Sequence, residues 1–342
     1  MKLKEYQKQN KTFIIAEIAQ AHDGSVGILH SLLVAAAATG VDAVKFQVHI
    51  AHAESSALEP FRIPFSYVDS TRYDYWRRME LPEEQWIKLK HRCDQLGVEF
   101  LATPFSNAAV DLLEKLGVTR YKIGSGDANN PLLLDKIART KKEIILSNGL
   151  CTLDELDLSV RQLKDAKCPI ALLQCTTKYP TAAEDVGLEW LAKLEARYQC
   201  PVGLSDHSGL IYPGLGAVSL GATVVETHIT FDRRMFGPDA PASLTIDEFS
   251  QLVEGIRFLE KARGAGPAKQ EKTGRDKLRR MFGKALAVNR DMQAGEIITF
   301  DDLEGKKPID GGISVFELND VVGHRLSIAK NAWDFLKKAD VE

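Results

Sequence analysis

The chain reads Val202-Gly203-Leu204-Ser205-Asp206-His207 and, shortly afterwards, Val224-Val225-Glu226-Thr227-His228. Each stretch is a short apolar run that ends in a histidine, and such runs are typical of buried strands. Parallel strands that lie side by side bring their carboxyl ends to the same edge of a sheet. The two imidazoles are therefore candidates for one metal site. The alternative is a pair of buried histidines that bond only to the backbone.

Eight such runs occur in the first 263 residues, and amphipathic stretches such as Glu83–Leu96 separate them. Nearly continuous apolar strands are typical of parallel sheets that helices cover on both faces. Eight βα units in about 250 residues predict a closed (β/α)8 TIM barrel over residues 1–263. A doubly wound sheet is the alternative, but it usually has a glycine-rich loop after its first strand, and Glu17–Gly24 lacks that pattern. The predicted strands are Phe13–Ile18, Ala43–Val48, Glu99–Thr103, Arg120–Ile123, Glu143–Ser147, Ile170–Gln174, Pro201–Ser205 and Thr223–Thr227.

Composition limits the partners of the 342-residue chain. Its net charge of −3 does not favour nucleic acid or an anionic membrane surface. We find no signal peptide and no apolar run of about 18 residues that could span a membrane. The five cysteines are scattered without a CxxC pair, which favours free thiols in a reducing cytoplasm.

The character of the chain changes after the eighth predicted strand. A charged stretch over 264–281 is predicted to be a linker, and 282–342 to be a small β-rich module with short strands such as Ala285–Val288. About sixty residues give only a small core, so we expect this module to gain stability from another part of the protein.

In barrel enzymes the active site lies at the carboxyl ends of the strands. Lys45 and Lys122 lie there inside apolar runs, where a charge is costly unless it is compensated. They could pair with Glu17 or Asp127, bind a phosphate or carboxylate, or, for one of them, act as a Schiff-base nucleophile. Hydroxyl and backbone donors nearby would complete an anion site. Other polar residues at the strand ends are Gln47, Thr103, Ser125, Ser147 and Ser205.

Several motifs resemble those of the sialic acid synthases, the group that makes N-acetylneuraminate and related nonulosonic acids. They occur in family order over nearly the whole chain, and the tail from about Phe282 is similar to the antifreeze-like SAF domain of these enzymes. The motifs are Ala16–Ile18, Asp42–Gln47, Tyr121–Asp127, Gln174–Pro180, Ser205–Gly209 and Gly237–Asp239.

This resemblance implies that phosphoenolpyruvate condenses with an open-chain N-acylated amino sugar, with the help of Mn²⁺ or Mg²⁺. It implies that His207 and His228 hold the metal, and that Glu17 binds a sugar hydroxyl or moves protons. Lys45 and Lys122 match residues that hold the phosphate and carboxylate. The implied substrate-binding residues are Gln47, Thr103, Ser125, Asp127, Ser147, Tyr179, Ser205 and Lys307.

The family resemblance also implies a domain-swapped homodimer, in which the SAF domain of one subunit places an arginine on the acyl group of the sugar in the other. Here that residue is Lys307, and a lysine lacks the planar fork of a guanidinium. The first loop, Ala19–Gly24, and the segment after Asp239 also depart from the family pattern, and an aromatic insert spans Phe61–Arg78. We therefore expect an altered acceptor sugar, such as a 2,4-diacetamido hexose, with N-acetylmannosamine as the alternative.

Other interpretations concern the remaining histidines and the function. His22 could touch the substrate or only brace its loop. His49 and His52 are predicted to lie in a solvated loop, with a second metal site as the alternative. Asp206 could orient an imidazole. Alternative functions are another phosphoenolpyruvate-dependent synthase that makes a keto sugar acid phosphate, a family member that binds sugar without turnover, and a carbohydrate- or ice-binding protein.

Overall fold

A computed structural model describes residues 1–264 and 275–342. The chain divides into two compact units, Met1–Ala265 and Gly266–Glu342, and each is described by itself. In the described residues, no helix is long and apolar enough to cross a membrane.

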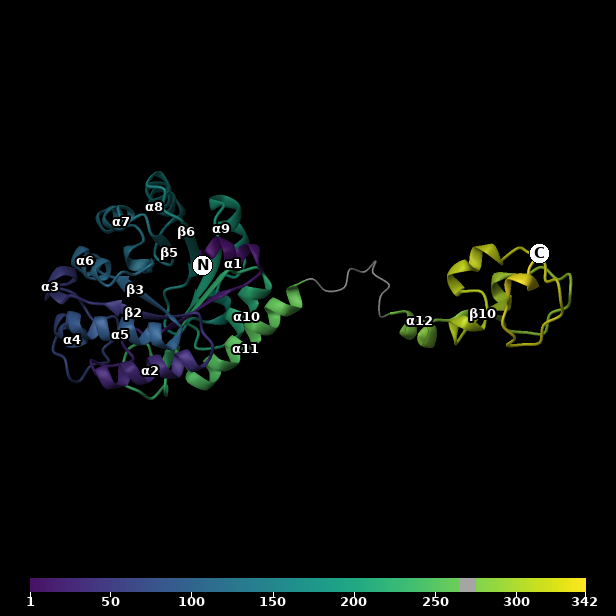
Figure 1. Cartoon of the computed structure of the whole chain (residues 1–342), viewed down its shortest axis with the longest axis horizontal. Helices are drawn as coiled ribbons and strands as arrows, with labels where there is room; N and C mark the ends of the chain where they lie inside the picture. Colours follow the sequence, from purple (N-terminus) through teal and green to yellow (C-terminus); the bar gives the residue numbers. More distant parts are fainter. Residues whose placement is uncertain (265–274) are drawn as a thin grey trace. The chain divides into compact units, whose positions relative to one another are not determined.

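The first unit is built on eight parallel strands with helices around them (Figure 1). The strands follow the order β3-β2-β1-β8-β7-β6-β5-β4, and β3 also contacts β4, so the barrel is nearly closed. The predicted barrel and its eight strands are thus confirmed. The strands are β1 (Phe13–Glu17), β2 (Ala43–Val48), β3 (Glu99–Pro104), β4 (Arg120–Ile123), β5 (Glu143–Ser147), β6 (Ile170–Cys175), β7 (Val202–Asp206) and β8 (Val224–Thr230).

Strand β8 extends beyond its predicted end at Thr227. It continues through His228 to Thr230 because Ile229 and Thr230 pair with the short strand β9 (Leu244–Thr245). The β9 pairing depends on a segment that follows a loop, so it left no signal in the apolar run itself. The consequence is that His228 lies within a paired strand, opposite Glu17 of β1.

Several helices that follow the strands begin at side-chain caps that their sequences provide. Ser25, Ser106 and Thr152 each accept a backbone N–H of the first helical turn, which satisfies a donor that has no partner within the helix. The helices of this unit are α1 (Leu3–Lys8), α2 (Val26–Ala38), α3 (Ala51–Glu54), α4 (Arg72–Met79), α5 (Glu83–Leu96), α6 (Asn107–Lys115), α7 (Pro131–Ala138), α8 (Leu153–Asp165), α9 (Trp190–Tyr198), α10 (Tyr212–Ser219) and α11 (Ile246–Arg263).

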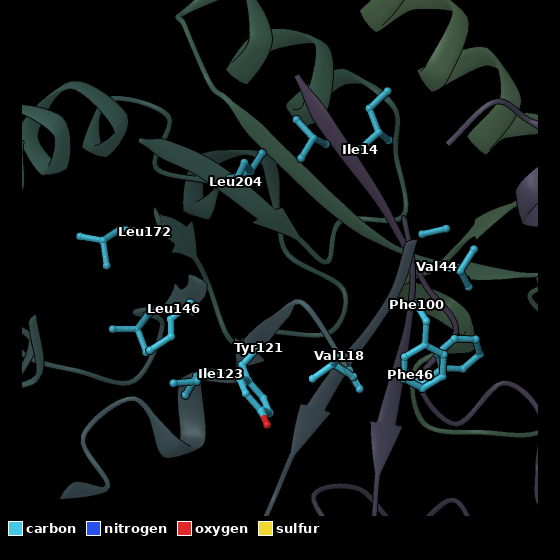
Figure 2. Close-up of a cluster of buried hydrophobic side chains, with 14 of the residues drawn as sticks. Ile14, Val44, Phe46, Phe100, Val118, Tyr121, Ile123, Leu146, Leu172 and Leu204 are labelled. Carbon is cyan, nitrogen blue, oxygen red and sulfur yellow. The ribbon is translucent and has the colours of Figure 1, made fainter. Parts of the chain in front are cut away.

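Alternation along the strands separates two layers of side chains. Ile14, Val44 and Leu146 belong to the large cluster that Figure 2 shows in part, whereas their neighbours Ile15 and Ile145 belong to a separate cluster with Leu3 of α1. Successive residues of a strand point to opposite faces, so the second cluster fills the barrel. Continuing along the same inward face in steps of two leads to Glu17, Lys45, Thr103, Lys122, Ser147, Ser205, Glu226 and His228.

The second unit contains α12 (Asp276–Phe282) and an antiparallel pair, β10 (Ala285–Val288) with β11 (Leu303–Lys306). Most of the predicted linker, residues 265–274, lies outside the described residues, and α12 forms over the end of that stretch. The SAF identity of this unit stays a prediction. Its small core consists of Leu286, Val288, Met292, Ile298, Ile313, Val321, Leu326 and Leu336.

Candidate active site

A cavity of about 380 Å³ opens at the carboxyl ends of the barrel strands, a size that suits a small-molecule site. Almost all of the predicted site residues line it. Glu17 does not line the cavity itself, but it contacts Lys45 and Gln47, which do. Lys307 lies in the second unit, with its Nζ 5.2 Å from the Phe282 ring. The predicted residues on the cavity wall are Lys45, Gln47, Thr103, Lys122, Ser125, Asp127, Ser147, Tyr179, Ser205, His207 and His228.

The inner part of the cavity holds a buried cluster of four charges. Lys45 Nζ lies 2.9 Å from Glu17 Oε2 and 3.1 Å from Glu226 Oε1. Lys122 Nζ lies 3.5 Å from Glu226 Oε1 and donates to Ser147 Oγ at 2.7 Å. The predicted ion pair with Glu17 is therefore present, and the second carboxylate is Glu226 rather than Asp127. Glu226 had a signal in the sequence, because it stands two residues before His228 in a buried run.

The two ammonium groups differ in their electrostatic setting. Burial lowers the pKa of Lys45, but the attraction of Glu17 and Glu226 outweighs it, so the net pKa is raised. Burial also lowers the pKa of Lys122, and there the repulsion of Lys45 adds to it, so the net pKa is lowered despite Glu226. Lys45 thus holds its proton more firmly than an ordinary lysine does, and Lys122 holds its proton less firmly.

Hydroxyl groups surround these lysines. Ser205 Oγ donates to Glu226 Oε1 at 3.0 Å, and Ser125 Oγ lies 3.0 Å from the backbone N–H of Gly149, whose hydrogen bond it accepts. Thr177 Oγ1 and Glu226 Oε2 are buried and have no hydrogen-bond partner within the described residues. Unpaired buried polar atoms are costly, so this wall is suited to a polar ligand that offers hydrogen-bond donors as well as acceptors.

The two predicted metal ligands lie together further out. The rings of His207 and His228 have centroids 5.2 Å apart. His207 Nδ1 lies 3.0 Å from the carbonyl oxygen of Thr176. Only an N–H can bond to a carbonyl, so the neutral ring keeps its Nε2 lone pair free for a ligand. Burial, together with His228, lowers the pKa of His207 to about 3, and the ring is neutral near pH 7.

Two imidazoles on adjacent strands fit a divalent cation that takes its other ligands from water or substrate. Within the described residues, no group of three His, Cys, Asp or Glu side chains could hold a metal ion. The protein alone thus offers an open, weakly binding position, which suits Mn²⁺ or Mg²⁺ with oxygen ligands from a bound substrate.

One prediction about the histidines was wrong. His49 is not solvated: it is 4 % exposed and lines the cavity. Its ring is stacked between Trp76, at 4.1 Å, and Phe105, at 4.6 Å, and its Nδ1 lies 2.6 Å from Glu54 Oε1. Trp76 belongs to α4, which folds back over this loop, and a long-range contact of this kind leaves no mark in the sequence around His49. His52 is exposed.

His22 and Asp206 serve their own loops. His22 is buried, and its Nδ1 accepts the backbone N–H of Gly24 at 3.1 Å; it is absent from the cavity wall. Asp206 Oδ2 accepts hydrogen bonds from the hydroxyl and the N–H of Ser208, whereas Thr176 is the partner of His207. His22 therefore does not line the cavity, and Asp206 is not the hydrogen-bond partner of His207.

The aromatic insert contributes an outer wall that the sequence did not predict. The Arg62 guanidinium lies 4.0 Å from the centre of the Tyr179 ring. Its Nη2 donates to Asp239 Oδ1 at 2.7 Å and to the carbonyl oxygen of Pro238 at 3.1 Å. Tyr179 in turn packs on His207, with ring centroids 4.1 Å apart. The insert therefore reaches the histidine pair through one aromatic ring.

A barrel with buried lysines and a histidine pair at the carboxyl ends of its strands has the layout of a TIM-barrel enzyme, whose active site lies at that face. The NeuB family profile matches residues 32–268. The chain therefore belongs to the NeuB family, the sialic acid synthases, whose members are transferases.

Named relatives agree with this placement. The N,N'-diacetyllegionaminic acid synthase of Legionella pneumophila is 35 % identical over 332 residues, which cover 94 % of this chain and 92 % of that protein. A pseudaminic acid synthase of Campylobacter jejuni is 31 % identical over 345 residues, 99 % of each chain. The crystal structure of the N-acetylneuraminic acid synthetase of Leptospira borgpetersenii superposes with a TM-score of 0.70 at 29 % identity, covering 79 % of this chain and 91 % of that one.

Proposed function

We propose that this protein condenses phosphoenolpyruvate with the open-chain aldehyde of an N-acylated amino sugar to give a nonulosonic acid and phosphate. The observation that carries the proposal is the convergence of Lys45, Lys122, His207 and His228 on one cavity. A trianionic enol ester and an aldehyde can be held side by side there, and the relatives are named for products of this reaction.

The lysines take the phosphate and the carboxylate of phosphoenolpyruvate, with hydroxyl donors from Ser125 and Ser147. Binding brings further negative charge next to Lys122 and raises its pKa, so the ligand strengthens the hold of this lysine on its proton. Glu17 and Glu226 hold the ammonium groups in place beforehand. Such positioning and charge compensation lower the barrier because they need no reorganisation during the reaction.

The reaction joins C3 of phosphoenolpyruvate to the aldehyde carbon, while water adds at C2 and phosphate leaves. A divalent metal at His207 and His228 would supply Lewis-acid polarisation of the aldehyde oxygen. Glu17 accepts a hydrogen bond from Gln47 Nε2 at 2.9 Å and lies behind Lys45 and Gln47, so its effect on a sugar hydroxyl would pass through these two side chains. Tyr179 covers the imidazole pair, and burial raises the pKa of its phenol, so it acts as a neutral hydrogen-bonding wall.

The acceptor is proposed to differ from N-acetylmannosamine, on the basis of Lys307, the first loop and the insert. Purified protein with phosphoenolpyruvate and Mn²⁺ should release phosphate with one member of a panel of N-acylated amino sugars and give a nine-carbon keto acid by mass spectrometry. Release with N-acetylmannosamine alone would contradict the altered acceptor. No release with any amino sugar, but release with a phosphorylated aldose, would favour a synthase of another keto sugar acid.

We also propose a cytoplasmic enzyme that works as a homodimer. The described cysteines, Cys93, Cys151, Cys168, Cys175 and Cys200, are free thiols, which supports a reducing compartment. Crosslinking between Lys307 of one subunit and the barrel of another, analysed by mass spectrometry, would test the domain swap. Crosslinks confined to single subunits would contradict it.

A further inference from the structure

Arg62 and Asp239 form an ion pair at the cavity wall, beside the imidazole pair. The Arg62 side chain is 35 % exposed and the Asp239 side chain 13 %. Asp239 Oδ1 is held by Arg62, and its Oδ2 lies 4.0 Å from His228 Nδ1. The two residues are far apart in the sequence, and their pairing exists because the insert folds onto the loop after β8.

The guanidinium has donors to spare. It carries five N–H groups, and within the described residues its hydrogen bonds leave only from Nη2, toward Asp239 and Pro238. Nε and Nη1 remain available on a group whose orientation is fixed by stacking on Tyr179. A planar, pre-oriented fork of this kind loses little conformational freedom when it binds a carbonyl oxygen.

The pair has no net charge, and it offers N–H donors beside a carboxylate acceptor. A secondary amide has the complementary pattern, because its C=O accepts and its N–H donates. An anionic group on the ligand would gain less, since Asp239 already compensates the guanidinium and would repel a second anion.

The position of the pair suits such an amide. In an open-chain 2-acylamino sugar the amide nitrogen is on the carbon next to the aldehyde. If the aldehyde is held at His207 and His228, the amide must lie directly beside them, and Asp239 is the carboxylate adjacent to His228.

We propose that Arg62, with Asp239, recognises the N-acyl amide of the acceptor sugar and determines the preference for acylated acceptors. This inference rests on the proposed function. It assigns a specificity role to a residue of the insert, supplied by the same chain as the barrel.

Binding of unreactive reduced sugars to the full chain, with Mn²⁺ and phosphoenolpyruvate present, tests the inference by calorimetry. The probes are N-acetylmannosaminitol and reduced 2,4-diacetamido-2,4,6-trideoxymannose, with mannitol as the matched probe that has no acyl amide. A hydrogen bond to a charged group is worth about ten- to a hundredfold in affinity. R62A should weaken the tighter acylated probe by about that factor and change mannitol binding less than about twofold. R62K, which keeps the charge without the fork, should fall in between.

The control is R77A, because Arg77 is exposed on α4 and does not line the cavity; it should bind every probe as the wild type does. Equal losses for acylated and plain probes in R62A, unchanged binding of both, or weaker binding of phosphoenolpyruvate would each overturn the inference. Those results leave the proposed function intact if the wild type still consumes phosphoenolpyruvate with an amino sugar. A wild type that neither binds an acylated probe nor turns over any amino sugar refutes the proposed function itself.

Discussion

Replacing Glu226 by Gln removes one of the two carboxylates that compensate the buried lysines. Glu226 Oε1 lies 3.1 Å from Lys45 Nζ and 3.5 Å from Lys122 Nζ, and its side chain is 5 % exposed. The variant keeps the shape of the side chain and the hydrogen bond from Ser205. It leaves two buried ammonium groups with Glu17 as their remaining close carboxylate, so the change isolates the charge.

The expected cost follows from this burial. Removing one partner of a buried ion pair costs about 3–5 kcal/mol. At roughly 2–4 °C per kcal/mol for a large domain, the melting temperature of E226Q should fall by at least about 6 °C. Burial and Lys45 already lower the pKa of Lys122, and loss of Glu226 lowers it further. A lysine with a depressed folded pKa destabilises most when pH is low enough to charge it, so the deficit should shrink as pH rises toward the ordinary lysine pKa.

Thermal melts by circular dichroism at several pH values measure this deficit. K122M/E226Q removes one charge of each sign and leaves the Lys45–Glu17 pair, so it should be more stable than E226Q. The surface control is E84Q: Glu84 is 74 % exposed beside Lys88, and its loss should leave the melting temperature unchanged. A melting temperature for E226Q within about 2 °C of wild type, without a pH trend and without rescue by K122M, would refute the reasoning.

Three further predictions concern other parts of the barrel. H207A should lose both turnover and the rise in melting temperature that Mn²⁺ gives the wild type, while its metal-free melt stays close to wild type; a persisting Mn²⁺ effect would remove His207 as a ligand. Burial, with His49 and Arg78, depresses the pKa of His22 from 6.5 to about 4, so the stability that it contributes is complete above pH 6.5 and is lost as pH falls to 4. Between pH 6.5 and 4, the free energy of unfolding measured by chemical denaturation should fall by about 3 kcal/mol less in H22Q than in the wild type. Parallel pH curves for the two proteins would contradict the assignment. In G203A the new Cβ would lie 2.2 Å from the carbonyl oxygen of Val224 and 2.8 Å from Leu173 Cδ2, so soluble yield or melting temperature should drop sharply. The control G126A, whose new Cβ has nothing within 4 Å, should melt as the wild type does. Equal melting temperatures for the two variants would show that the barrel can accommodate a side chain at position 203.

The sequence by itself determined the barrel and the inner half of the site. Each strand is a local apolar run, and the alternation of side chains with period two is a local property of the strand. Once the strands are parallel, the inward positions near their carboxyl ends are defined, and Lys45, Lys122, Ser147 and His228 follow directly. The same rule applied to β8 would have selected Glu226, two positions before His228.

The outer half was decided only by the tertiary structure. His49 was predicted to be solvated because it follows a strand and enters a loop, yet Trp76 and Phe105 enclose it. Arg62 meets Asp239 across a separation of 177 residues, and no local pattern in either segment indicates the other. Which loop covers which strand end depends on packing between distant segments, whose contacts are set by shape and burial rather than by the periodicity of either segment alone.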